Sequence, residues 1–453
     1  MSLENNPKVA IIGGGLAGTE CALTLAKYGI ASCIFEQKPE SMSPAHHLQD
    51  FGELVCSNSL RSNELSSGIG LLKQEMRELD SFFMCHADST AVPAGKALAV
   101  DRELFAKNIT HEVDNNPLIT VKRQQIASLD SAELLAYEQV ILAAGPLMSD
   151  NLALSLSSIL GGGELYFYDA IAPIVSAESL DRNIIFRASR YQEPEEGEKS
   201  GEYLNCPMEK DEYLAFYEAL LVGEKVQAKG FEKEIHFEGC MPIEALAERG
   251  VRTLTFGPLK PVGFIDPRTG RRPYAIIQLR TENLNESMYN LVGCQTKLSY
   301  AAQQRIFRMI PGLENAEFIR FGSMHRNTYV NAPKVLDENL CLKMSSKKIR
   351  LAGQITGVEG YVESAACGLW VALNIVAEVQ NKPLPLPPEQ SALGALMMHL
   401  RTEVKKFQPS NAHFGLMPEL GVRAKKQERK VMYSARAREH FASWFADFKA
   451  NGF

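Results

Sequence analysis

The chain lacks paired cysteines. Its 453 residues include nine cysteines, an odd number, and no two of them form a C-x-x-C pair. Disulfide-rich secreted domains and zinc sites of the cysteine type both need paired or regularly spaced cysteines. We therefore expect reduced thiols, no disulfide framework and no metal site.

A long apolar run and a secretory signal are also missing. We expect no stretch long enough to cross a bilayer, and residues 1–6 have neither the charged nor the apolar region of a leader. Internal repeats and low-complexity tracts are absent. With 45% hydrophobic and 23% charged residues, the composition is typical of a globular protein of two or three domains. We expect a cytoplasmic protein with no membrane partner and no obligate protein partner.

Charge is segregated along the chain. Residues 401–453 hold eleven Lys/Arg and five acids, a local charge of +6, so the remainder must carry −12 to give the overall −6. A second basic cluster lies at Arg268, Arg271 and Arg272. A charge run by itself is usually a solvated face, but segregation of sign makes a polyanionic partner plausible.

A complete dinucleotide fingerprint opens the chain. An apolar strand over residues 9–12 leads into the turn Gly13-Gly14-Gly15-Leu16-Ala17-Gly18, a helix follows to Tyr28, and a second strand over 31–35 ends at Glu36. A lone G-x-G-x-x-G is weak evidence, but here strand, turn, helix, strand and acid occur in order.

Each fingerprint position has a mechanical reason. Gly13 permits the tight turn, Gly15 lets the backbone approach a pyrophosphate, Gly18 allows close helix–strand packing, and Glu36 accepts hydrogen bonds from ribose hydroxyls. The cofactor-binding residues predicted from this motif are Gly13, Gly15, Leu16, Ala17, Gly18, Glu36 and Gln37.

Later segments favour FAD over NAD. Residues 139–146 form a buried strand that ends in glycine, and residues 348–360 repeat the strand-to-glycine-turn plan before a helix over 361–379. The two helix N-termini would converge on one extended cofactor, one at the pyrophosphate and one at the flavin N1/O2 edge. These segments add five predicted cofactor residues: Gly145, Gly353, Gln354, Gly357 and Val358.

The order of elements predicts an α/β fold. We expect a Rossmann-like, glutathione-reductase-like FAD-binding domain whose first part covers residues 1–185 and whose return covers 336–453 with basic C-terminal helices. An α+β domain, residues 186–335, is inserted between them, with helices over 210–221 and 301–309 and strands over 234–238, 274–280 and 289–292.

Two cysteines lie in polar turns. Cys56 precedes Ser-Asn-Ser, and Cys240 stands between a glycine and a Met-Pro turn. Backbone N–H groups and nearby cations lower a thiol pKa in such turns. Cys21, Cys33 and Cys367 instead fall in predicted helices or strands, where a cysteine is an inert small hydrophobe.

Long motifs extend over nearly the whole chain. They are SPAHH (Ser43 to His47), ELVCSNSLRS (Glu53 to Ser62), GLLKQEM (Gly70 to Met76), VPAGKALAVDRELF (Val92 to Phe105), YLNCPM (Tyr203 to Met208), EGCMPIE (Glu238 to Glu244), FGPLKPVGFIDPRTGRRPYAIIQLR (Phe256 to Arg280), RMIPGLENAEFIRFGSMHRNTYVNAP (Arg308 to Pro333) and GQITGVEGYVESAACG (Gly353 to Gly368). Together these motifs resemble the folate- and FAD-dependent tRNA (uracil-5-)-methyltransferase family.

The resemblance implies that a methylene group from 5,10-methylenetetrahydrofolate passes through the flavin to C5 of a uridine, most simply the T-loop uridine 54 of tRNA, with NAD(P)H as reductant. Uracil C5 is a poor nucleophile, so a thiolate must first add at C6. Cys240 matches the family cysteine chosen for that attack, and Cys56 matches the partner thiol near the flavin. The assignment between the two stays open.

The resemblance also suggests contacts for folate and RNA. His325 and Arg326 are candidate folate contacts, although a purely structural histidine is an equal alternative at 325, and Arg61 is a further candidate. Because no second complete fingerprint exists, NAD(P)H would visit the flavin transiently. The expected RNA contacts are Arg268, Arg271, Arg272, Lys405, Lys406, Lys425, Lys426 and Arg429.

Four alternatives remain. The same chemistry could act on a 23S ribosomal RNA uridine. The related flavoprotein that modifies the tRNA wobble uridine with a GTPase partner has a much longer C-terminal helical extension. A plain NAD(P)H:flavin oxidoreductase needs neither the turn cysteines nor the basic tail, and an RNA-binding folding aid would not need Cys56 or Cys240.

Overall fold

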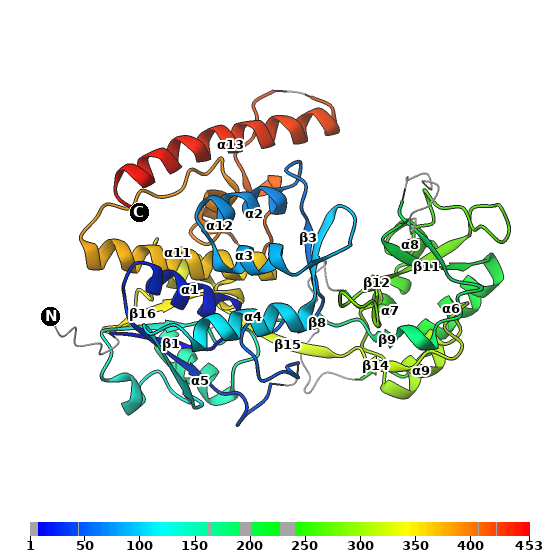
Figure 1. The fold of residues 1–453 in the computed structure, drawn as a ribbon, viewed down its shortest axis with the longest axis horizontal. Coiled ribbons are helices and arrows are strands. Elements are labelled where there is room, and N and C mark those ends of the chain that lie inside the picture. The colour runs from blue at the N-terminus through cyan, green and yellow to red at the C-terminus, as the bar shows by residue number, and fades with distance from the viewer. Residues whose placement is uncertain are drawn as a thin grey trace.

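The computed structural model describes residues 8–43, 45–161, 165–190, 201–226, 241–405, 407–422 and 424–453. It has two units, each with its own apolar core, joined by a long two-stranded ribbon (Figure 1). The first unit holds both the N-terminal fingerprint and the described residues from Tyr329 onward.

A five-stranded parallel sheet forms the centre of the first unit. Its strand order is β16-β7-β1-β2-β6, so the fingerprint strand β1 lies in the middle and pairs with β2 on one side and β7 on the other. The inner strands β1 and β7 are buried along their whole length, whereas residues of the edge strand β6 alternate between more buried and more exposed positions. The five strands are β1 (Val9–Ile12), β2 (Ser32–Glu36), β6 (Ile119–Arg123), β7 (Gln139–Leu142) and β16 (Lys348–Leu351).

Two helices that follow glycine turns pack directly on each other. These are α1 (Leu16–Lys27) and α11 (Tyr361–Gln380). Among the described residues, α11 is the one helix that is long and apolar enough to cross a membrane, which corrects our expectation from the sequence. However, 83% of its most apolar window is buried inside the protein, as in the core helix of a globular fold.

The second unit is built on a six-stranded antiparallel sheet of order β10-β11-β12-β13-β9-β14. The ribbon of β8 (Leu165–Ala170) and β15 (Met324–Tyr329) connects it to the first unit. The expected boundaries at 186 and 335 fall after β9 and after β15. Its elements are β9 (Ile174–Ser176), β10 (Phe186–Ala188), β11 (Tyr203–Met208), α6 (Lys210–Val222), α7 (Ile243–Ala247), α8 (Thr253–Phe256), β12 (Ala275–Thr281), β13 (Met288–Leu291), α9 (Tyr300–Phe307) and β14 (Phe318–Arg320). The strand expected at 234–238 lies outside the described residues.

A small sheet and seven helices complete the described part of the first unit. The long C-terminal helix α13, red in Figure 1, lies over α2. Its apolar face packs through Phe441, Trp444 and Phe448, and the Trp444 indole N–H donates to the Pro385 carbonyl at 3.0 Å. The remaining elements are β3 (Ser59–Ser62), β4 (Ala91–Val92), β5 (Ala97–Val100), α2 (Gly68–Glu78), α3 (Phe82–Ser89), α4 (Arg102–Asp114), α5 (Asp150–Leu160), α10 (Ala332–Val335), α12 (Ala392–His399) and α13 (Lys426–Ala450).

A buried carboxyl in α1 gives the stability of this unit a pH dependence. Glu20 accepts the Phe83 N–H at 2.7 Å, and burial raises the pKa of Glu20 to about 7. An acid whose pKa is raised in the folded state stabilises it at low pH, and this contribution is lost as pH rises through the folded pKa.

The variant Glu20→Gln, which cannot ionise, should therefore become more stable relative to the wild type as pH rises from about 5 to 8. The change in the difference of unfolding free energy should be up to about 3 kcal/mol. Urea unfolding at several pH values measures it, with the exposed Glu403→Gln as control. A difference that does not vary with pH would contradict the assignment.

Candidate active site

A cleft opens at the carboxyl ends of β1, β7 and β16. Its empty volume is about 1090 Å³, open solvent included. Nine of the twelve predicted cofactor residues line it, whereas Gly18, Gly357 and Val358 do not. The nine are Gly13, Gly15, Leu16, Ala17, Glu36, Gln37, Gly145, Gly353 and Gln354. Ligands of open parallel sheets bind at this edge.

The fingerprint glycines have two different roles. Gly13 has φ +104°, and a Cβ there would lie 2.6 Å from the Ala143 carbonyl oxygen, while a Cβ at Gly18 would lie 2.0 Å from the Gly13 oxygen. The packing of the protein itself therefore requires glycine at both of these positions. At Gly15, however, a Cβ would meet no protein atom within 4 Å and would enter the cleft. This cradle beside the α1 N-terminus fits a pyrophosphate.

Glu36 closes the first turn. Its carboxylate accepts the Gly14 N–H at 2.7 Å and the Lys38 N–H at 2.8 Å, and the side chain is buried while still lining the cleft. A carboxylate has about four acceptor positions, so two remain for ribose hydroxyls. The geometry of Glu36 thus fits the expected binding of ribose hydroxyls. Its hydrogen bonds to the Gly14 and Lys38 N–H groups add a structural role that the sequence did not reveal.

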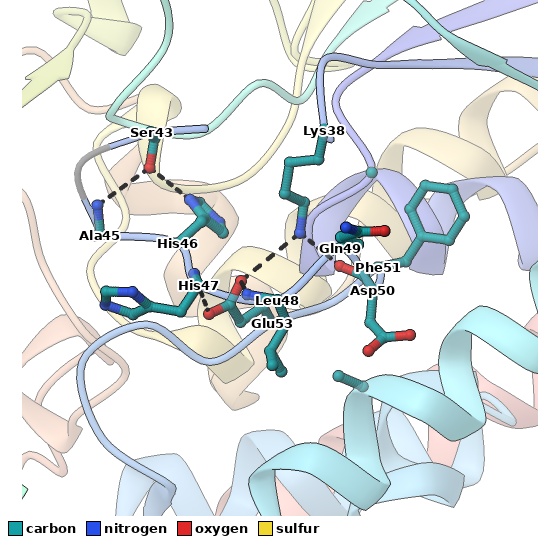
Figure 2. A network of polar contacts seen from close by, with 12 residues as sticks. Lys38, Ser43, Ala45, His46, His47, Leu48, Gln49, Asp50, Phe51 and Glu53 are labelled. Atoms are coloured by element: carbon teal, nitrogen blue, oxygen red, sulfur yellow. Dashed lines mark hydrogen bonds and ion pairs between the residues drawn. The ribbon is translucent and has the colours of Figure 1, made fainter. Parts of the chain in front are cut away.

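Sequence analysis missed a buried ion pair at this end of the cleft. In Figure 2 the Lys38 ammonium points at the Asp50 carbonyl and the Glu53 carboxylate, at 2.5 and 3.7 Å. Glu53 also accepts the His47 and Leu48 N–H groups, at 2.8 and 3.1 Å. Burial lowers the pKa of Lys38. The SPAHH and ELVC motifs, which contain His47 and Glu53, could have pointed to these residues. Their contact, however, forms only when the chain folds.

The second glycine turn brings α11 to the same cleft. Tyr361 and Ser364, in its first turn, line the cleft with Gly353 and Gln354. Gly357 is instead a packing position, since it has φ +95° and a Cβ there would lie 2.4 Å from the Phe407 ring. The N-termini of α1 and α11 therefore face one cleft, as the flavin interpretation requires.

The Cys56 turn is held from both units. The Tyr361 hydroxyl of α11 accepts the Cys56 N–H at 2.6 Å and the Ser57 N–H at 3.1 Å. From the second unit, the Arg320 guanidinium donates to the Cys56 carbonyl at 3.1 Å and Arg280 donates to the Ser57 hydroxyl at 2.6 Å. Cys56 thus lies half-buried at the junction between cleft and second unit.

Arg61, at the end of the same segment, has a strained backbone. Its φ is +65°, which is rare for a residue other than glycine. Its guanidinium pairs with Glu363 of α11 at 3.3 Å, and the buried Lys73 ammonium donates to the Leu60 carbonyl at 2.7 Å. Burial lowers the pKa of Lys73 to about 7. Strain of this kind concentrates at functional sites.

The three cysteines that we expect to be inert are buried. Cys21, Cys33 and Cys367 are fully buried, and burial raises the pKa of Cys367 to about 12. Cys240 lies outside the described residues, which resume at Met241. Residues 325 and 326 belong to β15, but their side chains lie outside the described part, so the folate contacts stay predictions.

The residues predicted to contact RNA differ in how they are held. Arg268 binds the buried Asp266 carboxylate through its Nη2 and Nε, at 2.8 and 3.1 Å, so it also holds its own turn. Five other predicted contacts have side chains that the structure describes, and all five are exposed: Arg271, Arg272, Lys405, Lys425 and Arg429. Lys426 begins α13, its side chain being outside the described part, as is the whole of Lys406.

Comparison with known proteins agrees with this geometry. The family model described as glucose inhibited division protein A (GIDA) matches residues 8–383. A methylenetetrahydrofolate–tRNA-(uracil-5-)-methyltransferase TrmFO from Nitratidesulfovibrio vulgaris is 64% identical over 446 residues, which cover 98% of this chain and 93% of that protein. A protein of the same name from Geotalea daltonii is 52% identical over 442 residues, which cover 97% and 98%.

A solved structure shows the same fold. Aquifex aeolicus GidA in its form I crystal gives a TM-score of 0.67 at 17% identity, covering 98% of this chain and 78% of that one. The fold and cleft thus define a two-unit flavoprotein with a Rossmann-like α/β domain, which confirms the expected fold class. The chain belongs to the GIDA family and, within it, to the methylenetetrahydrofolate–tRNA-(uracil-5-)-methyltransferases.

Gly15→Val should remove bound FAD without unfolding the protein. The backbone at Gly15 has φ −78°, open to any residue, and no protein atom obstructs a side chain. The valine would overlap the pyrophosphate, and overpacking of about 1–3 kcal/mol lowers affinity roughly five- to a hundredfold. Flavin absorbance after gel filtration measures retention, and urea unfolding of the apoproteins is the control. Wild-type flavin content would contradict this role.

Tyr361→Phe should loosen the Cys56 turn. The variant leaves the Cys56 and Ser57 N–H groups without their acceptor, and each unmade buried hydrogen bond costs about 1–3 kcal/mol. Amide hydrogen exchange at residues 56 and 57 should accelerate. Tyr217→Phe on α6, in the second unit, is the matched control. Unchanged exchange in the Tyr361 variant would show that other contacts hold the turn.

Proposed function

We propose that this protein forms 5-methyluridine in RNA, at the T-loop uridine 54 of tRNA, with 5,10-methylenetetrahydrofolate as carbon donor and NAD(P)H as reductant. The observation that carries the proposal is the Cys56 turn, which is held by Tyr361 from the flavin cleft and by Arg320 from the second unit. A thiol at this junction would meet both a cofactor in the cleft and a substrate that enters between the units.

The thiol chemistry follows from the reactivity of uracil. Attack of the Cys240 thiolate on C6 forms an S–C bond and moves the electron pair of the C5–C6 double bond to C5, which becomes nucleophilic. After C5 has bonded to the methylene carbon, a base removes the C5 proton and the bond between that carbon and its nitrogen carrier breaks. A hydride equivalent, drawn from NAD(P)H, then adds to the methylene carbon to give the methyl group, and the C5–C6 double bond re-forms as the thiolate leaves C6. Cys56 is the partner thiol at the flavin side, with the reverse assignment of the two cysteines kept open.

The residues of the cleft support FAD as the resident cofactor. Gly15 and the α1 N-terminus would hold the pyrophosphate, Glu36 the ribose, and the α11 N-terminus the N1/O2 edge of the ring. When bound, FAD supplies the carrier and redox chemistry. NAD(P)H would reach the ring transiently, since the sequence holds one complete fingerprint. His325 and Arg326 remain the proposed folate contacts.

RNA would bind to the exposed cations. Arg271 and Arg272 lie on a loop of the second unit, and Lys405, Lys425 and Arg429 lie in the basic C-terminal region of the first. Phosphate contacts of this type release counterions, so binding should weaken as salt rises. A uridine folded into a loop must also be turned out of its stack to reach a cleft. Such a reaction belongs to the cytoplasm, where tRNA matures.

The choice of RNA is decided by one assay. Purified protein is incubated with methylenetetrahydrofolate, reduced nicotinamide and unmodified transcripts of tRNA or of 23S ribosomal RNA, and new 5-methyluridine is mapped. Product at tRNA position 54 supports the proposal, and product in ribosomal RNA alone would replace the substrate. Flavin reduction with no product in either RNA would favour a plain NAD(P)H:flavin oxidoreductase.

Cys240→Ala should abolish both the covalent RNA adduct and 5-methyluridine while leaving the flavin bound. Cys56→Ala should also stop methylation, because the partner thiol is lost. Cys85→Ala is the matched control, since Cys85 is an exposed cysteine on α3. Adducts are read on denaturing gels and product by nucleoside analysis. Methylation by the Cys240 variant would remove it as nucleophile, and an adduct lost only in the Cys56 variant would exchange the two roles.

Charge reversal at Lys425 and Lys426 should weaken RNA binding without changing flavin reduction. Loss of two phosphate contacts should reduce the slope of log affinity against log salt by about 2. Lys107→Glu on α4 is the control for a changed net charge. Equal RNA affinity in the double variant and the wild type would move the RNA site away from α13.

A further inference from the structure

Three aromatic rings stack on the surface of the second unit. The rings of Tyr300 and Phe321 have centroids 4.9 Å apart at 17°, and those of Phe321 and Phe318 have centroids 5.0 Å apart at 12°. Tyr300, at the end of this aromatic ladder, is 60% exposed, whereas Phe318 and Phe321 are half-buried. The ladder therefore has an inner end against the core and an outer end toward solvent.

Hydrogen bonds hold the ladder in place. The Gly322 N–H donates to Gln303 Oε1 at 2.7 Å, and Gln303 Nε2 donates to the Gly322 carbonyl at 2.9 Å, so the side chain of α9 clamps the backbone next to Phe321. Ser299 caps α9, with its hydroxyl accepting the Ala302 N–H at 3.2 Å, and this orients the first helical residue, Tyr300. The outer ring is thus pre-organised.

Residues close to the ladder in the sequence contact the Cys56 turn and the first described residues after Cys240. Residues 295–297 bind the first described residues after Cys240, because Ile243 N–H donates to the Gln295 carbonyl at 2.7 Å and Lys297 N–H donates to Glu244 at 2.6 Å. Arg320, between the ladder residues Phe318 and Phe321, donates to the Cys56 carbonyl. In Figure 1, β14 and α9 lie together in this part of the second unit.

We propose that the outer face of Tyr300 stacks on a nucleobase of the RNA substrate that neighbours the modified uridine. A near-parallel ladder of rings continues naturally with another flat ring, and every nucleobase has such a face. A uridine turned out of its stack also leaves its neighbour without a partner, which an exposed aromatic ring replaces. This inference rests on the proposed function, because the same RNA must reach both cysteine segments.

The decisive variant is Tyr300→Leu, which keeps an apolar side chain but removes the ring. Its affinity for a T-arm hairpin transcript should fall roughly five- to a hundredfold, as for loss of one base–aromatic stack. Tyr300→Phe should bind as the wild type does. Ile319→Ala is the control, since Ile319 is an exposed apolar residue of β14, beside the ladder residue Phe318, but is not part of the ladder.

Two further measurements, 2-aminopurine fluorescence and the KM for methylenetetrahydrofolate, identify what stacks on Tyr300. In hairpins with 2-aminopurine at single positions beside the uridine, the wild type should quench one position and Tyr300→Leu should not. The KM for methylenetetrahydrofolate should be equal in both proteins. Unchanged RNA affinity in Tyr300→Leu overturns the proposal, and a raised folate KM with unchanged RNA affinity would assign the ring to the pterin instead.

The same samples separate this proposal from the proposed function. RNA binding that depends on Tyr300, without any 5-methyluridine from the wild type, would remove the proposed reaction and keep the stacking site. Wild-type product together with RNA binding that is independent of Tyr300 would remove the stacking site and keep the reaction. Flavin content and the circular dichroism spectrum should be equal in all variants.

Discussion

The close crossing of α1 and α11 is the constraint on which the candidate site depends. A Cβ at Gly368 of α11 would lie 2.2 Å from the Ala17 carbonyl oxygen of α1. Only glycine allows these backbones to touch, and the contact brings two helix N-termini, 345 positions apart between Leu16 and Tyr361, to one cleft. A larger residue at this crossing would push the two helices apart. The partial positive charges at their N-termini would then no longer face the same cleft.

The junction between the units depends on directional polar contacts. Asn58 is fully buried and donates to the carbonyls of Val100 and Thr281, while it accepts from Arg280 at 2.9 Å. With Arg320 on the Cys56 carbonyl, these bonds define where the Cys56 turn lies relative to the second unit. Buried networks of this kind specify one geometry, because loss of a single partner leaves a desolvated polar group unpaired. The Cys56 turn is therefore positioned by residues of both the cleft and the second unit.

Much of the fold could be predicted from periodicity and glycine turns. The helix expected over 361–379 is α11, the helix over 210–221 is α6, and the strand over 274–280 is β12, each within one or two residues at its ends. The fingerprint distinguished Gly15, which faces the cleft, from the packing position Gly18, but nothing in the sequence showed that Gly357 faces the Phe407 ring. Outside such a motif, a glycine required by packing and a glycine required by a ligand look the same in a sequence.

The sequence alone determined the parallel sheet, the two glycine turns and the family, because local patterns and long motifs carry that information along the chain. Only the tertiary structure decided which groups meet across it. The Lys38–Glu53 pair, the Tyr361 hydroxyl on Cys56, and the ladder of Tyr300, Phe321 and Phe318 each join segments whose distance in space no local pattern encodes. Chain folding sets these distances, since packing and hydrogen bonding must be satisfied throughout both cores at once.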